Sequence, residues 1–379
     1  MNPKQTPNTC FPINIAILAI AITIAACQPE TIAPPLPDKT LLIYFGGDNN
    51  LSDETYQKIK AIKEGLPPSS PQHNILLYHD PANATPTLTE LKKINNQTTI
   101  DTIATYDETN SASPTTLAQV ITQIQTTHPA KNYTLLIFSH GSGWLPQGAL
   151  INPTLRSITL DGSTEMELAA FARAIPDHTF DHIVFEACFM AGIEVAYELR
   201  NKTNYILASS AEIVSPGFTA IYPDAFAYIL DPTPANFANY AFNHFDQLEG
   251  EYRSATLSLV RTARLPQLAS FISDHCRHDT IINVNTIQHF DRNRTYRLFF
   301  DFEDYYFRLL DNDAKRIELQ RLIDDCVIWK ASTPTFLPST NGFNITRHSG
   351  LTVYIPQDKF PVLNILYQST QWKIATLPK

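Results

Sequence analysis

Two reactive side chains, His140 and Cys188, each follow an apolar run rich in β-branched residues. The run TLLIF stands just before Ser139 and His140, and HIVFEA stands before Cys188. Buried parallel strands have this composition, and open α/β sheets carry their chemistry at the carboxyl ends of the strands. A thiol needs a neighbouring base to act as a nucleophile, and imidazole is the usual one. The two segments therefore predict nucleophilic catalysis by Cys188 with His140 as the proton partner.

The elements that must position this pair follow from an alternation of strands and helices. Strands are expected at 41–50, 73–80, 99–107, 133–139, 182–188 and 204–210, with helices after several of them. This order predicts an α/β fold with a mainly parallel sheet and helices on both faces. The last third is less regular, with helical patterns at 235–247, 265–277 and 315–328 and a late strand at 350–356. We interpret 40–232 as a catalytic core and 233–379 as a subdomain packed on it.

Composition limits the class of protein. The chain has 379 residues, 44% of them hydrophobic, which is enough for a large core. Its formal net charge of −9 argues against a nucleic-acid-binding surface. Cys276 and Cys326 would be free to pair in an oxidising compartment, and the sequence leaves open whether they do.

The amino terminus has the pattern of an export signal. Residues 13–26 are apolar but short for a membrane span, and they end in Ala25-Ala26-Cys27, which resembles the lipobox of bacterial lipoproteins. The resemblance implies a signal peptide at 1–26, cleavage before Cys27 and lipid on that cysteine. Gln28 then implies delivery to the outer membrane, and the proline-rich residues 27–39 would form an extended tether. An ordinary secretory signal and an uncleaved anchor remain alternatives.

Five segments, in this order, resemble the clostripain family of cysteine peptidases, which are relatives of caspases. They are GGDNNL (46–51), FSHGSGW (138–144), FEACFMAGIEV (185–195), ASSAEIVSPGF (208–218) and GLTVYIP (350–356). The separation of 48 positions from His140 to Cys188 also fits the roughly 50-residue separation of caspases. The resemblance implies a caspase-like α/β/α sandwich, peptide or protein substrates, and an oxyanion hole formed by the N–H groups of Gly141 and Cys188.

The residue two positions before the nucleophile is expected to set specificity. Positions i and i+2 of a strand face the same side, so Glu186 should border the cleft beside Cys188. The family prefers Arg or Lys before the scissile bond and usually has Asp at this position. Cleavage after basic residues is therefore expected, with Glu212 and Asp48 as further candidate pocket carboxylates. The alternative is that Glu186 is the partner of a structural salt bridge.

Some members of the family cleave themselves after the histidine strand, and Arg156 is the expected site here. No cofactor is expected; some relatives need calcium, but the sequence has no EF-hand pattern. Two other functions stay open. One is a non-catalytic surface lipoprotein that binds peptides or glycans, and the other is a different cysteine hydrolase or transpeptidase on the same scaffold.

Overall fold

The structure is a computed structural model that describes residues 1–3, 35–107, 110–146, 160–162, 164–277, 280, 282–292 and 296–378. The chain divides into two units, Met1–Pro35 and Leu36–Lys379, and the second holds all the helices and strands given below. Cys27, Arg156 and most of the expected signal peptide and tether lie outside the described residues. Among the residues described, no helix is long and apolar enough to cross a membrane.

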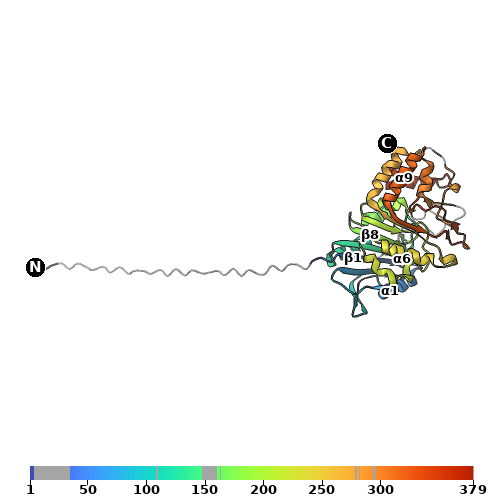
Figure 1. The fold of residues 1–379 in the computed structure, drawn as a ribbon. Helices are drawn as coiled ribbons and strands as arrows, with labels where there is room; N and C mark the ends of the chain where they lie inside the picture. Colours follow the sequence, from blue (N-terminus) through green and yellow to red (C-terminus); the bar gives the residue numbers. More distant parts are fainter. Residues whose placement is uncertain are drawn as a thin grey trace. The chain divides into compact units, whose positions relative to one another are not determined.

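A single large sheet organises the second unit (Figure 1). Its five central strands pair in parallel in the order β9-β8-β5-β1-β2, and antiparallel strands extend both edges. Along the sheet, the strands are β12 (Val327–Ser332), β10 (Thr256–Arg261), β9 (Thr203–Ala208), β8 (Phe180–Glu186), β5 (Asn132–Phe138), β1 (Lys39–Gly47), β2 (His73–Pro81), β3 (Thr87–Ile94) and β4 (Gln97–Thr105). The mainly parallel α/β sheet expected from the sequence is confirmed.

Helices cover both faces because the central strands are apolar on both. In β1, Leu42 and Tyr44 point into one core, whereas Leu41, Ile43 and Phe45 point into the other. The first core is closed by α2 (Pro114–Thr127), α3 (Leu168–Ala174), α4 (Ile193–Glu198), α7 (Leu265–His275), α9 (Asp313–Cys326) and α11 (Gln371–Ala375). The second is closed by α1 (Ser52–Gly65), α5 (Tyr222–Ala225) and α6 (Ala235–Asp246). The result is an α/β/α sandwich.

Several boundaries differ from the expected ones. Strand β3 was not expected, because its sequence TLTELKKI is largely polar and only half buried. The boundary expected at 232/233 does not divide the sheet, since β10 and β12 both belong to it. The late segment 350–356 contributes only β15 (Thr352–Val353), which pairs with β11 (Phe300–Asp301). The remaining elements are β6 (Leu160–Asp161), β7 (Thr164–Glu165), α8 (Phe302–Arg308), β13 (Thr335–Phe336), β14 (Phe343–Asn344), α10 (Pro361–Tyr367) and short 3₁₀ turns at Gly217–Ala220, Phe226–Leu230, Gly250–Tyr252, Thr262–Arg264 and Val284–Thr286.

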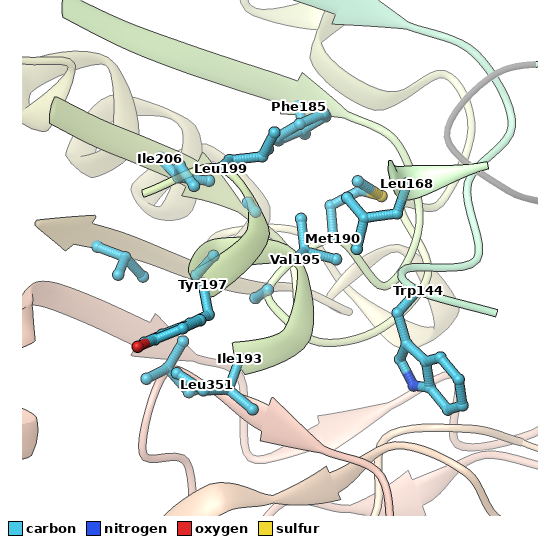
Figure 2. Close-up of a cluster of buried hydrophobic side chains, with 14 of the residues drawn as sticks. Trp144, Leu168, Phe185, Met190, Ile193, Val195, Tyr197, Leu199, Ile206 and Leu351 are labelled. Atoms are coloured by element: carbon cyan, nitrogen blue, oxygen red, sulfur yellow. The ribbon is translucent and has the colours of Figure 1, made fainter. Parts of the chain in front are cut away.

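The turns that carry the reactive residues are anchored by their own apolar side chains (Figure 2). Trp144, at the end of the histidine segment, and Met190, two residues after Cys188, both belong to the first core. Met190 shares this core with Leu168, Phe185 and residues of α4, and the Trp144 ring packs against Tyr354 and Tyr367, with ring centroids 5.0 and 5.3 Å away. Burial of large apolar groups on both sides of the reactive residues fixes these turns against the sheet. Elsewhere in the same core, Cys276 and Cys326 are free buried thiols, so this structure does not pair them.

Candidate active site

His140 and Cys188 leave the sheet from neighbouring strands and line one cavity of about 380 Å³. Strands β5 and β8 are parallel, and their register places Phe138 beside Glu186. His140 and Cys188 each stand two residues beyond this pair, so both chains turn away from the sheet at the same level. The structure therefore brings the two sequence-predicted residues to one site at the carboxyl edge of the sheet.

Cys188 is a protonated thiol at rest. Burial raises its pKa to about 12; the Glu212 carboxylate adds to the rise, whereas the Ile213 N–H and Arg292 oppose it. The Ile213 N–H donates a hydrogen bond to Sγ over 3.4 Å. Only a minute fraction of such a thiol is ionised near neutral pH. Attack by Cys188 therefore requires a base that takes the proton as the substrate reacts.

His140 is held by a residue that sequence reasoning missed. Its Nε2 lies 2.8 Å from Oδ1 of Asn50, in the turn between β1 and α1. An amide oxygen only accepts, so Nε2 carries the hydrogen and the ring orientation is set by Asn50. Asn50 belongs to the GGDNNL segment (46–51), one of the five that resemble the clostripain family. That motif was the signal that could have identified it.

Gly141 allows the histidine turn to pack directly on the cysteine turn. A Cβ at this position would lie 2.7 Å from the Cys188 carbonyl oxygen, 2.9 Å from Ala187 Cβ and 3.1 Å from the Cys188 nitrogen. Only glycine permits this approach. Phe189 then reverses the chain with a φ of 61°, a strained value for a non-glycine residue. The predicted oxyanion donors, the N–H groups of Gly141 and Cys188, thus belong to two turns in direct contact.

Glu186 lines the cavity, but its carboxylate is already bound within the protein. Its side chain is 1% exposed, and Oε1 lies 2.6 Å from Nζ of Lys58. It also accepts hydrogen bonds from Phe218 N–H at 2.5 Å and Tyr222 O–H at 2.5 Å. Burial raises the pKa of Glu186, while Lys58 and the other two donors oppose the rise. The geometry favours the alternative of a structural salt bridge over a free specificity carboxylate.

The strand alternation used to pair Glu186 with Cys188 does not reach the cysteine. Strand β8 ends at Glu186, whose partners Lys58 and Tyr222 lie on α1 and α5. Cys188, beyond the strand, packs against the opposite core. Both residues border the cavity, but from different sides of the sheet.

Glu212 also lines the cavity and is also paired. Arg292 forms a bidentate ion pair with it, in which Nη2 lies 2.9 Å from Oε1 and Nε donates to Oε2. The two side chains are about equally exposed, at 27% for Glu212 and 30% for Arg292. The pair is therefore accessible to solvent, unlike Glu186 and Lys58.

Asp48 lies elsewhere, and its expected place in the pocket is not supported. It lines a separate cavity of about 580 Å³ together with Asp80 and Asp161. Strand β1 lies between β2 and β5, and the turn after it leads Asp48 towards the end of β2, away from the strands of His140 and Cys188. Burial and the Asp161 carboxyl raise the pKa of Asp80 to about 7 there. No group of three or more His, Cys, Asp or Glu residues suited to a metal ion occurs among the residues described.

Comparison with known proteins decides the family. The model of the clostripain family matches residues 43–327, most of the chain. The chain belongs to the clostripain family. Among its relatives is clostripain from Hathewaya histolytica, 28% identical over 216 residues. That alignment covers 47% of this chain and 40% of clostripain, so the chain matches less than half of the curated relative's length.

Solved structures agree with this membership of the clostripain family. An inactive zymogen C11 protease from Parabacteroides distasonis is 30% identical, with a TM-score of 0.79, and the match covers 91% of this chain and 100% of that one. A secreted C11 cysteine protease from Bacteroides thetaiotaomicron, solved with an irreversible peptide inhibitor, shares the fold at 24% identity and a TM-score of 0.79, over 89% of this chain and 98% of that one. Membership of the clostripain family indicates a hydrolase of the cysteine peptidase type.

Proposed function

We propose that this protein is a cysteine endopeptidase that cleaves peptide or protein substrates after basic residues. The observation that carries the proposal is that Cys188 and His140 border one cavity at the carboxyl edge of the sheet. A nucleophile and its base must share a cleft that a substrate can enter, and this cavity is large enough for a side chain. The family membership supports the same chemistry.

The charges around the cavity support a basic substrate residue. Three carboxylates line it, on Glu54, Glu186 and Glu212. Two cations contact them, Lys58 and Arg292. Among the residues described, three negative charges against two positive ones leave a surplus of one negative charge, which attracts a cationic side chain.

The proposed reaction uses His140 twice. It accepts the Cys188 proton while Sγ forms a bond to the substrate carbonyl carbon, and negative charge moves to the carbonyl oxygen beside the Gly141 and Cys188 N–H groups. The C–N bond then breaks, and His140 gives its proton to the leaving amine. The thioester that remains is hydrolysed by a water molecule that His140 deprotonates. The carboxylic acid product leaves and the thiol is restored.

Reporter peptides that differ only in the residue before the scissile bond test this function. The wild type is expected to cleave after Arg and Lys, and Cys188→Ala is expected to abolish cleavage. Cys276→Ala, which removes a buried thiol away from the cavity, is the matched control and should retain it. No cleavage by the wild type would favour the non-catalytic lipoprotein. A preference for Asn or acidic residues would refute the specificity.

We also propose that the protein is anchored in the cell envelope through lipid on Cys27, with the outer membrane as its destination. The apolar run at 13–26 and the Ala25-Ala26-Cys27 sequence support this. Detergent phase partitioning of the expressed protein is the test. Cys27→Ser should move the protein from the detergent phase to the aqueous phase, whereas Cys10→Ser should not. Equal partitioning of the wild type and Cys27→Ser would contradict the lipid anchor.

A further inference from the structure

We propose that Glu54, not Glu186, is the carboxylate that recognises the basic side chain of the substrate. The inference rests on the proposed function, because it assigns the specificity of that same cavity. Glu54 stands in the first turn of α1 and lines the cavity with His140 and Cys188. Nothing in its local sequence distinguishes it from an ordinary acidic residue at a helix N-terminus.

Glu186 has little capacity left for an incoming cation. Its Oε1 accepts from Lys58 and from the Phe218 N–H, and its Oε2 accepts from the Tyr222 hydroxyl. All three are donors, and together they use three of the roughly four acceptor sites of a carboxylate. A Cβ on Gly217 would lie 2.5 Å from Oε1, which shows how closely the loop covers this group.

Lys58 cannot be displaced easily from this arrangement. Its side chain is fully buried, and its three protons are used by Glu186 Oε1 at 2.6 Å, Thr219 Oγ1 at 2.9 Å and the Pro216 carbonyl oxygen at 3.0 Å. The ammonium also lies over the Phe138 ring, 4.2 Å from its centroid. A substrate cation that replaced Lys58 would leave a buried ammonium without its partner, which is strongly unfavourable. The Lys58–Glu186 pair is therefore a fixed, neutral unit.

Once Lys58 is paired with Glu186, the negative charge of Glu54 is left without a cation of its own in the part of the chain that the structure describes. Its Oε1 lies 3.1 Å from Nζ of Lys58, an ammonium already committed to three acceptors. Within the described part of the chain, its Oε2 accepts one hydrogen bond, a long one of 3.3 Å from the Ser215 hydroxyl. The side chain is 17% exposed, against 1% for Glu186. A guanidinium or ammonium that enters the cavity can bind Glu54 without breaking a buried ion pair.

Glu212 is the other accessible carboxylate, but it is already neutralised. Arg292 binds both of its oxygens, and a further arginine or lysine would have to compete with this pair. Among the residues described, Glu54 is thus the cavity carboxylate whose charge is not balanced one to one by a cation.

The test is the ratio of kcat/KM for two reporters that differ only in having Arg or norleucine before the scissile bond. The ratio does not depend on how much of a variant is folded, so a partly unfolded variant still gives an answer. Glu54→Gln should lower the ratio roughly 10- to 100-fold, the loss expected for a hydrogen bond to a charged group. Asp53→Asn, an exposed neutralisation in the same turn, is the matched control and should leave the ratio unchanged.

The outcomes separate this assignment from the proposed function. A wild type that cleaves neither reporter, or both alike, contradicts the proposed function and the assignment with it. A wild-type preference for Arg that survives in Glu54→Gln overturns the assignment alone. If Glu186→Gln instead lowers the ratio while Glu54→Gln keeps it, Glu186 is the recognition residue after all.

Discussion

Replacement of Lys58 by Met is expected to destabilise the protein strongly. Met has a similar length and can fill the space over the Phe138 ring that the ammonium now occupies, so little cavity forms. What is lost is the ammonium that balances Glu186, a pair with side chains 0% and 1% exposed. Removing one partner of a buried ion pair costs about 3–5 kcal/mol, because the other charge stays buried. With an unfolding entropy near 2.1 cal/mol/K per residue, a body of about 340 residues should lose roughly 4–7 °C in Tm.

The destabilisation by Lys58→Met must depend on pH. Burial already raises the pKa of Glu186, and without Lys58 that pKa in the folded protein rises further. A carboxyl whose folded-state pKa exceeds its unfolded value costs stability as the pH rises through the folded pKa, and costs nothing below the unfolded value. The variant should therefore lose more Tm at pH 8 than at pH 5.

Thermal unfolding followed by circular dichroism at both pH values provides the measurement. Lys60→Met, an exposed lysine one half-turn further along α1, is the matched control and should shift Tm by less than about 1 °C. Lys58→Met/Glu186→Gln removes both charges and should recover most of the loss. A Tm for Lys58→Met close to the wild type, or a loss that is equal at both pH values, would refute the buried ion pair.

Three further changes test other parts of the site. Asn50→Ala should lower kcat by about 100-fold with a smaller effect on KM, because His140 loses the acceptor at 2.8 Å that orients it; an unchanged kcat would exclude that role. Gly141→Ala should cost a similar factor, since its Cβ would lie 2.7 Å from the Cys188 carbonyl oxygen, and full activity would show that the two turns are not tightly packed. Arg156→Ala should prevent self-cleavage on SDS gels, and a wild-type chain that is active while intact would contradict cleavage there.

The strands that precede His140 and Cys188 could be predicted because their signals are local. Strands β5 and β8 are short apolar runs that end at polar and small residues, and the parallel order followed from the alternation with helices. Strand β3 was not predicted because five of its eight residues are polar, so the apolar pattern of a strand is weak there. The roles of His140 and Cys188 stay predictions, although the structure brings both to one cavity.

The environment of Glu186 could not be predicted from the sequence. Its ammonium partner is 128 positions away, on a helix whose other lysines are exposed or half buried. A lysine on an amphipathic helix is normally solvated, so no pattern marks Lys58 as buried. The rule that residues i and i+2 of a strand face the same side holds only while the strand continues. Strand β8 ends at Glu186, so the rule does not extend to Cys188. Pairing over such a distance is a property of the packed structure alone.

The Lys58–Glu186 pair also affects the geometry of the cavity, because α1 and the turn before it hold residues that line the cavity or bind His140. Asn50 in that turn binds His140, while Leu51 and Glu54 line the cavity. Lys58, one turn after Glu54, ties the same helix to the end of β8, and Cys188 follows β8 by two residues. The ion pair therefore fixes His140 and Glu54 relative to Cys188. A buried charge pair that adds little net stability can still be favoured when it sets the relative position of two such elements.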